Sequence, residues 1–509
     1  MILLDGNSLT LEDVVKVARG YEEVGLSDEG RNQIIKSREI VDKILEQETP
    51  VYGISTGFGD FSTIFISKEK REKLQRNLIL SHATGVGECL PEDVVRSAML
   101  LRANSLSKGY SGIKLSSVEM LINMLNKRVC PAVPAKGSVG ASGDLAPLSH
   151  MVLVMLGEGK AFVNGKLMTG AEALAEVGLK PVVLSGKEGL ALINGTQIMT
   201  AVGCMVWQDA VDLMKTADVA AALCVEALKG TRTAFDSRIS LVRAHLGQLA
   251  TTENLLRLTQ DSPIIASHVN CSKVQDAYSL RCVPQVHGAS KDALRRAEET
   301  LTIEINAATD NPLIMPDTGE AISGGNFHGQ PIALVMDYLK LALAELGNIS
   351  ERRTNRLLDA HLSELPPFLT AYPGEDSGLM ITQYTAASLV SENKVLVHPA
   401  SADSIPTSAN QEDHVSMGTI AARQAREILE NVRYILAIEC LAAAQGIDFL
   451  APLAPGVGTG AAHKAIREAV PHLDEDRIPS PDIKAIYDLI ANRTMIEKVE
   501  TAVGTLKIS

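Results

Sequence analysis

Two long stretches of regularly spaced apolar residues constrain the fold of this chain more than any other feature. In the first stretch, apolar residues recur every three or four positions, at Ile332, Val335, Leu339, Leu343, Leu346 and Ile349. The second stretch, between residues 413 and 445, repeats this spacing at Ile428, Val432, Ile435 and Ile438. Such spacing places apolar side chains on one face of an α-helix, and each helix would be about 30 residues long. Helices of this length usually pack side by side, so we expect a long helical bundle, extended by contacts between subunits.

The N-terminal part of the chain has a different pattern. A short strand should come first, followed by a helix for which Thr10 is the N-cap, with Asp13 three residues later. Residues 67–128 are expected to be helical, whereas the glycines and prolines of residues 131–150 predict a loop. In residues 160–168 an Asn-Gly pair predicts the turn of a small hairpin. This part should therefore combine helices with a few strands.

These patterns together predict a mainly α protein with two domains. Residues 1–190 would form a smaller N-terminal domain of helices and a few strands, and residues 191–509 a central and C-terminal bundle of long helices. Between the two periodic stretches, residues 364–411 are rich in Pro, Ser and Thr, which predicts an irregular segment. A loop of that length inside a compact domain is often functional.

The overall charge narrows the classes of partner. With a formal net charge of −13, the chain lacks the basic balance that nucleic-acid binding requires, so we expect no nucleic-acid partner. No apolar run reaches the ~18 residues of a membrane span, and the first residues lack the basic region of a signal peptide. We therefore expect a cytoplasmic protein with no membrane partner.

The cysteines and histidines give no sign of a metal centre. The seven cysteines are scattered, and no two have the C-x-x-C spacing of a zinc knuckle. The histidines form no H-E-x-x-H pattern. We expect reduced thiols and no metal site.

The segment from Gly140 to His150, GASGDLAPLSH, contains three small residues that can react with one another. Gly143 has no Cβ, so the backbone can fold back and bring its nitrogen onto the carbonyl carbon of Ala141. That bond closes a five-membered ring, and loss of the Ser142 hydroxyl as water leaves an exocyclic methylidene. The product would be an internal electrophile, which no ordinary side chain supplies.

Other polar residues lie in short, glycine-flanked segments far apart in the sequence. Convergence of several such loops on one pocket is a common way for a helical bundle to build a site. The segments are VYGISTGFG with Tyr52, LILSHATGVG with His82, LALINGTQ with Asn194, VQDAYSLRC with Gln275, Tyr278 and Arg281, SGGNFHGQ with Phe327, and SANQEDHVS with Glu412.

With these motifs in this order, the chain resembles the histidine ammonia-lyases over essentially its whole length. Members of that family build a methylidene-imidazolone group (MIO) from an internal Ala-Ser-Gly. The motifs that carry the resemblance are GSVGASGDLAPLSH, INGTQ, VQDAYSLR, SGGNFHGQP and ANQEDHVSMG. The resemblance implies that Ala141, Ser142 and Gly143 form MIO and that no dissociable cofactor is needed. The methylidene would add to the substrate amine and make it a better leaving group.

The resemblance also implies a base that removes a β-proton, which is scarcely acidic. Tyr52 is our candidate, and Tyr278 is either the rival base or its hydrogen-bonding partner. A phenol with a pKa of about 10 must have that value lowered to act at neutral pH, so it needs neighbouring donors or positive charge.

The remaining residues would hold the substrate. Arg281 can bind the substrate carboxylate through two parallel hydrogen bonds, and on a helix it shares a face with Tyr278. Asn194 and Gln275 can orient the amine, the ring carbonyl or the carboxylate without adding charge. Phe327 would form a wall of the pocket.

His82 and Glu412 determine the expected substrate. Glu412 could accept the N–H of an imidazole ring, and His82 could add a second polar contact. In the related phenylalanine ammonia-lyases, the position of His82 resembles an apolar pocket wall. The pair Ser81-His82, together with residues 411–414, therefore looks like the histidine type.

The resemblance predicts an enzyme that eliminates ammonia from L-histidine to give trans-urocanate, the first step of histidine degradation. It also implies a homotetramer with 222 symmetry, in which each active site draws on three chains. One alternative keeps the chemistry and changes the substrate: a tyrosine or phenylalanine ammonia-lyase, or an aminomutase. Another is a catalytically silent helical scaffold, which predicts the loss of a reactive residue, and none is lost.

Overall fold

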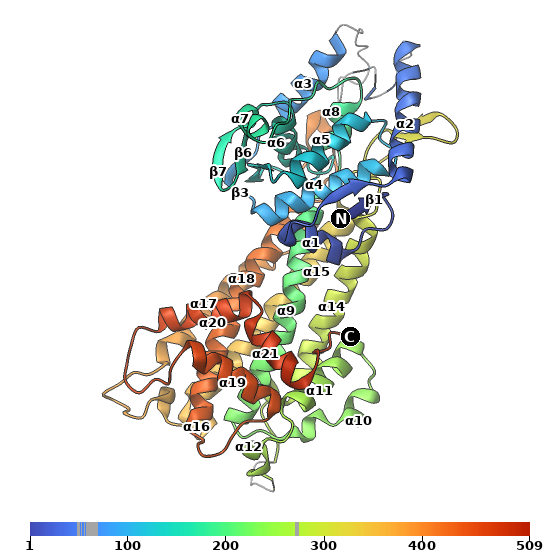
Figure 1. Cartoon of the computed structure of the whole chain (residues 1–509). Helices are drawn as coiled ribbons and strands as arrows, with labels where there is room; N and C mark the ends of the chain where they lie inside the picture. Colours follow the sequence, from blue (N-terminus) through green and yellow to red (C-terminus); the bar gives the residue numbers. More distant parts are fainter. Residues whose placement is uncertain (48–50, 52, 55, 57–69, 270–273) are drawn as a thin grey trace. The chain divides into compact units, whose positions relative to one another are not determined.

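The chain folds into two compact units. A computed structural model describes residues 1–47, 51, 53–54, 56, 70–269 and 274–509. The first unit comprises Met1–Met205, Glu298–Asp337 and Pro399–Arg423. The second comprises Val206–Ala297, Tyr338–His398 and Gln424–Ser509. The chain passes from one unit to the other at five points, of which one is between His398 and Pro399. The other four fall inside long helices labelled in Figure 1, which are α9 (Gln197–Ala227), α14 (Val283–Glu304), α15 (Gln330–Leu358) and α18 (Gly418–Asp448).

The protein is mainly α, as the apolar periodicity predicts. Helix α15 contains the first periodic stretch and α18 contains the second. All ten periodic residues are buried, and burial of each large aliphatic side chain stabilises the fold by about 1.5–3 kcal/mol. The prediction of two long helices is therefore confirmed, and the structure adds α9 and α14.

Eight further helices belong to the first unit. They are α1 (Leu11–Gly20), α2 (Asp28–Glu46), α3 (Arg71–His82), α4 (Glu92–Ser107), α5 (Leu115–Asn126), α6 (Leu145–Met155), α7 (Gly170–Glu176) and α8 (Glu188–Ile193). The start of α1 confirms the predicted cap, because the Thr10 side chain accepts from the Asp13 N–H while the Asp13 carboxylate accepts from the Thr10 N–H. Helices α3, α6 and α8 pack against one another, and this packing positions the site described below.

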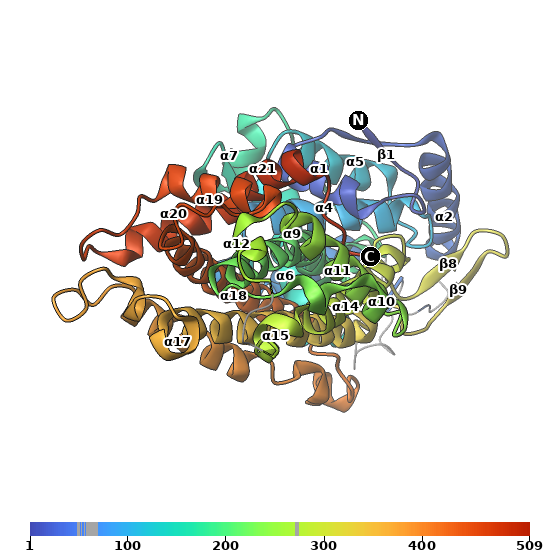
Figure 2. The same cartoon turned by 90° about the horizontal axis from the view of Figure 1, so that it is seen from below.

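The strands of the first unit form small sheets. Strand β1 (Ile2–Leu4) pairs in parallel with β2 (Val24–Leu26), and β3 (Val86–Cys89) pairs with β5 (Pro134–Lys136). Strand β6 (Lys160–Val163) lies between β4 (Cys130–Pro131) and β7 (Lys166–Thr169), and β8 (Leu313–Met315) pairs with β9 (Glu320–Ile322). Strand β8 contacts α2, as Figure 2 shows.

The predicted hairpin is confirmed. Strands β6 and β7 are antiparallel, and both turn residues, Asn164 and Gly165, have positive φ angles of 50° and 76°. An Asn-Gly pair adopts these angles readily, so the two-residue turn matches the twist of its strands.

Two local predictions in the first unit are wrong in part. Strand β3 interrupts the region predicted to be helical, and α6 begins at Leu145, inside the segment predicted to be a loop. The loop prediction rested on Pro131, Pro134 and Gly137, which all precede α6, and the further proline of this segment, Pro147, lies in the first turn of that helix. The N–H groups of a first turn have no partner within the helix, so a proline costs little at that position.

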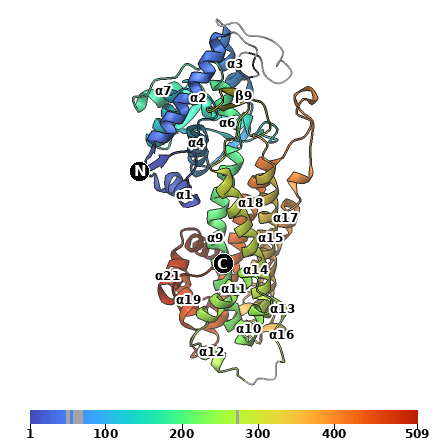
Figure 3. The ribbon, with the colours of Figure 1, turned by 90° about the vertical axis from the view of Figure 1, so that its right-hand side faces the viewer.

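The second unit contains shorter helices in addition to parts of the four long helices. They are α10 (Ser237–Leu241), α11 (Leu246–Leu258), α12 (Pro263–Ala266), α13 (Tyr278–Arg281), α16 (Ala360–Ser363), α17 (Met380–Leu396), α19 (Val457–Ala469), α20 (Pro479–Ala491) and α21 (Thr494–Val503). Helices α19 and α21 pack side by side (Figure 3). Helix α17 corrects the prediction that residues 364–411 are irregular throughout. Its 17 residues contain no Gly or Pro, and the Ser and Thr residues among them hid the helical pattern.

The described residues contain neither a membrane-spanning helix nor a cluster of metal-binding side chains. No helix there is long and apolar enough to cross a membrane. Within the same ranges, no three His, Cys, Asp or Glu side chains gather in a way that could hold a metal ion.

Candidate active site

The reactive tripeptide lies in a tight turn before α6. Gly140 and Gly143 have positive φ angles of 67° and 69°, which favour glycine. A Cβ on Gly143 would lie 2.2 Å from the carbonyl oxygen of Gly195, and the next residue, Asp144, donates its N–H to that oxygen at 2.8 Å. Gly143 is therefore required twice, by its backbone angle and by its close contact with a second loop.

Ser142 is held by a residue from that second loop. Its hydroxyl donates a hydrogen bond to Oδ1 of Asn194 at 2.7 Å. Asn194 is buried at the end of α8, and its amide nitrogen donates to the carbonyl oxygen of Asn311 at 3.2 Å and to Oδ1 of Asp310 at 3.4 Å. The structure thus brings together Ser142 and Asn194, which the sequence analysis selected independently.

Asp144 fixes the base of the same turn. Its carboxylate is fully buried and accepts hydrogen bonds from the Met199 N–H at 2.8 Å, from Ser138 at 3.0 Å and from the Thr419 hydroxyl. Burial raises the pKa of Asp144, although these hydrogen bonds act in the opposite direction. Asp144 was not among the predicted site residues, although its place directly after the Ala-Ser-Gly tripeptide could have indicated a role in holding that turn.

A cavity of about 250 Å³ opens over the tripeptide. It brings Ser142 together with two more predicted residues, His82 and Glu412. The described residues that line it are Ser81, His82, Thr84, Gly137, Ser138, Val139, Ala141, Ser142, Gly143, Leu145, Ala146, Thr407 and Glu412. The cavity therefore places an imidazole and a carboxylate beside the serine.

His82 and Glu412 of this cavity are held by different segments of the chain. His82 is the last residue of α3, and its Nδ1 lies 3.0 Å from the Ser81 hydroxyl. Burial lowers the pKa of His82, and the negative charge of Glu412 partly opposes this. The Glu412 carboxylate accepts from the Thr407 hydroxyl at 3.0 Å, and backbone bonds in both directions join the same two residues. Thr407 was missed by the sequence analysis, because no motif marks it.

Phe327 and its neighbour lie in the first unit outside this cavity lining. Phe327 is half-buried in the loop before α15. His328 stacks on His414 with ring centroids 5.7 Å apart and nearly parallel planes. The stacking joins the Phe327 loop to the segment that carries Glu412.

Three other predicted residues belong to a different unit from Ser142, His82 and Glu412. Gln275, Tyr278 and Arg281 belong to the second unit, where Gln275 and Arg281 line a separate cavity of about 520 Å³. Tyr278 is 71% exposed, and the Arg281 guanidinium lies 4.5 Å from the centre of its ring. The buried Nε of Arg281 has no hydrogen-bond partner in the described part of the chain. Tyr52 lies outside the described residues.

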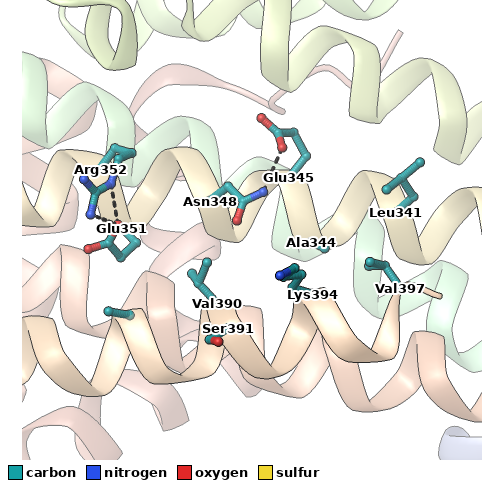
Figure 4. Close-up of a pocket in the computed structure, with 11 residues that line it drawn as sticks. Leu341, Ala344, Glu345, Asn348, Glu351, Arg352, Val390, Ser391, Lys394 and Val397 are labelled. Carbon is teal, nitrogen blue, oxygen red and sulfur yellow. Dashed lines mark hydrogen bonds and ion pairs between the residues drawn. The ribbon is translucent and has the colours of Figure 1, made fainter.

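The most voluminous of these cavities, about 590 Å³, lies between α15 and α17 in the second unit (Figure 4). Its walls carry Glu345, which accepts from Asn348 at 2.9 Å, and an ion pair between Glu351 and Arg352. None of the predicted site residues lines it. Volume alone therefore does not single out the cavity that the predicted residues Ser142, His82 and Glu412 line.

The chain is similar to known proteins over almost its whole length. A family model described as aromatic amino acid lyase matches residues 9–468. A histidine ammonia-lyase of Alkaliphilus oremlandii is 58% identical over 99% of this chain and 99% of that protein. The crystal structure of histidine ammonia-lyase from Trypanosoma cruzi superposes with a TM-score of 0.91, at 43% identity, over 99% of this chain and 95% of that one. A tyrosine aminomutase from Streptomyces globisporus superposes with a TM-score of 0.94, at 38% identity, over 99% of this chain and 100% of that one.

The chain belongs to the aromatic amino acid lyase family. The family model matches most of the chain, and a relative that is 58% identical covers 99% of it, so the similarity is one of sequence as well as of fold. Among the relatives, those with 52–58% identity carry the name histidine ammonia-lyase. Solved structures with the same fold carry more than one enzyme name, so the fold alone does not identify a substrate.

Proposed function

We infer that this chain is a histidine ammonia-lyase, a carbon–nitrogen lyase that converts L-histidine to trans-urocanate and ammonia in the first step of histidine degradation. The observation that carries the inference is the cavity that Ser142, His82 and Glu412 line together. The full-length identity with histidine ammonia-lyases supports it.

We propose that Ala141, Ser142 and Gly143 close to form MIO, with no dissociable cofactor. The Gly143 nitrogen bonds to the Ala141 carbonyl carbon, whose oxygen leaves as water, and Ser142 loses its hydroxyl and Cα hydrogen as a second water. The residues fit this group, because the φ angle of Gly143 folds the turn tightly and Asn194 holds the Ser142 hydroxyl. MIO supplies an electrophile to which the substrate amine can add.

The residues around the cavity would bind and orient the substrate. Glu412 accepts an imidazole N–H, held in place by Thr407, and His82 contributes a second polar contact as a largely neutral ring. Asn194 presents a carbonyl oxygen toward the reacting amine. Phe327 forms a wall beside the ring.

A second set of residues would complete the chemistry. Tyr52 removes the β-proton, with Tyr278 as its rival or hydrogen-bonding partner. The guanidinium of Arg281 holds the substrate carboxylate, and Gln275 orients it. Within the described residues the buried Nε of Arg281 has no hydrogen-bond partner, and this supports the role, because such a nitrogen is suited to a ligand.

We propose that the protein is a cytoplasmic homotetramer in which the sites are shared between subunits. The exposure of Tyr278 supports sharing, since a residue so open to solvent on one chain can form part of a water-excluding site once another chain covers it. The acidic composition supports a cytoplasmic location.

One assay separates this function from its rivals. Purified protein is mixed with L-histidine, L-tyrosine or L-phenylalanine, and both ammonia release and the ultraviolet absorbance of the unsaturated product are followed. Turnover of histidine alone supports the inference. Turnover of tyrosine or phenylalanine with none of histidine contradicts it and favours the alternative lyases or an aminomutase, and no turnover of any substrate favours a silent scaffold.

A further inference from the structure

A fully buried ion pair lies behind the residue that holds Ser142. Lys187 and Asp310, both with no exposed side-chain surface, form a 2.7 Å contact between Nζ and Oδ2. Removing two charges from water is costly, so such a pair persists only when further hydrogen bonds satisfy it. None of the roles described so far uses either residue.

The pair is built into the segments that carry the site. Lys187 is the N-cap of α8, and Asn194 is the C-cap of the same short helix. Lys187 also has a φ of 74°, a left-handed conformation that is strained for a lysine. The left-handed backbone of Lys187 and the short helix α8 together hold the Lys187 ammonium group in place relative to the Asn194 amide.

The other carboxylate oxygen of Asp310 reaches Asn194. Oδ1 accepts from the Asn311 N–H at 2.7 Å and lies 3.4 Å from the Asn194 amide nitrogen. The same amide nitrogen donates to the Asn311 carbonyl oxygen at 3.2 Å. A carboxylate and a carbonyl can only accept, so both require the NH₂ end of Asn194 to face them.

This requirement determines the direction of the remaining hydrogen bond. With its NH₂ group toward Asp310, Asn194 must turn its carbonyl oxygen toward Ser142, and the Ser142 hydroxyl must donate. The four groups form one chain of hydrogen bonds, in which Lys187 and Asn194 donate to Asp310 and Ser142 donates to Asn194. Once Ser142 has lost its hydroxyl, the same carbonyl oxygen is free to accept from a substrate amine.

We propose that Lys187 and Asp310 are a positioning pair that determines which end of the Asn194 amide faces Ser142. This inference rests on the proposed function, because it assigns a consequence for ring formation and amine binding to the orientation of Asn194. Neither residue touches the substrate, and both act through Asn194.

The test is Asp310→Asn, which keeps the side-chain shape and removes its charge. An asparagine has one acceptor oxygen, so it cannot serve Lys187, the Asn311 N–H and Asn194 together, and its own NH₂ can face Asn194 and reverse that amide. Three quantities are measured on purified protein: the fraction of chains that have lost two waters by intact mass, the kcat and KM for L-histidine, and the thermal unfolding midpoint. A lower midpoint alone would indicate a purely structural role.

Glu188→Gln is the matched control. Glu188 adjoins Lys187 and is fully buried, and its carboxylate accepts from Ser117 and Ser185, with no hydrogen bond to Asn194 among the described residues. We expect Asp310→Asn to lower the ring-containing fraction or kcat by about 10- to 100-fold with little change in KM, as for loss of a hydrogen bond to a charged group. Glu188→Gln should keep both within about threefold, the ordinary scatter for a residue outside the site.

The outcomes are separable. A ring fraction and a kcat for Asp310→Asn equal to those of the wild type overturn the proposal. If Asp310→Asn does not fold, the neutral double variant Lys187→Met with Asp310→Asn decides, since it leaves no uncompensated charge. Its ring fraction or kcat should fall in the same way, and wild-type values overturn the proposal. Absence of the ring and of turnover in the wild type contradicts the proposed function instead.

Discussion

The hydroxyl of Ser142 donates to the side-chain oxygen of Asn194 at 2.7 Å, across 52 positions of sequence. The contact exists because α6 and α8 pack against each other, so that the turn before one helix meets the end of the other. It holds the leaving hydroxyl of the proposed ring precursor in one direction.

Replacing Gly143 by alanine should prevent ring formation. The added Cβ would lie 2.2 Å from the Gly195 oxygen, and the φ of 69° would be strained for alanine. We expect a loss of about 1–3 kcal/mol in the free energy of unfolding and no loss of two waters by intact mass. Gly178→Ala is the control, since Gly178 has a φ of 71° and open space where a Cβ would lie. A Gly143→Ala protein with a normal ring would contradict the geometry.

Replacing Glu412 by glutamine should weaken selection of the imidazole ring. The variant keeps its shape and its contact with Thr407 but loses the charge that accepts the substrate N–H. We expect kcat/KM for L-histidine to fall by about 10- to 100-fold, the cost of a hydrogen bond to a charged group. Asp413→Asn, at the exposed neighbouring carboxylate, should leave it nearly unchanged. If the two variants have equal kcat/KM, Glu412 is not the imidazole acceptor.

The stability of the protein should decline as the pH falls below about 6.5, the ordinary pKa of histidine. His287 is fully buried, and burial lowers its pKa, against a hydrogen bond to Asp218 that raises it. A histidine with a lowered pKa in the folded state binds more protons when unfolded, so acid favours unfolding. The slope is up to about 1.4 kcal/mol per pH unit for such a group, and it ends once the pH is below the folded-state pKa.

Urea unfolding between pH 5 and 8 measures this slope. His287→Asn should reduce the dependence on pH, whereas His245→Asn, at a largely exposed histidine, should not. An equal slope for the wild type and His287→Asn would exclude His287 as its source.

Two inactive variants should restore activity when they are co-expressed. If each site combines Ser142 of one subunit with Tyr278 of another, mixed oligomers of Ser142→Ala and Tyr278→Phe chains contain some intact sites. Random mixing predicts roughly a quarter of the sites active. Kinetics on the isolated mixed species, compared with each variant alone, measure the recovery. Mixed oligomers with no recovered activity would show that each site belongs to one chain.

An element of the fold was predictable when its cause lies in residues that are close together in the sequence. The apolar residues of α15 and α18 repeat at the helical period over many turns, so their helices were predicted from local pattern alone. The Asn164-Gly165 hairpin likewise has a local cause. Helix α17 was missed because its Ser and Thr residues resemble those of a loop, and packing of Ala386 against Ile435 and Ile438 stabilises it instead.

The residues around the candidate site also fall into two groups, those that motifs predicted and those that no local pattern marks. Ser142, Asn194, His82 and Glu412 were predicted from motifs, and the structure places all four in the first unit. Lys187 and Asp310 are 123 positions apart, and no spacing in the sequence marks two charges that meet inside a protein. Only packing of distant segments reveals such a pair, because burial itself makes it significant.

The intact mass of the wild type, beside that of Ser142→Ala, tests the central claim most directly. Closure of the ring removes two waters, so the wild-type chain should be lighter than its sequence mass by about 36 Da. Ser142→Ala should fold, have its full sequence mass and lose at least about a thousandfold in kcat, since it lacks the electrophile. A wild-type chain of full sequence mass that still releases ammonia from L-histidine, or an active Ser142→Ala protein, would contradict the account.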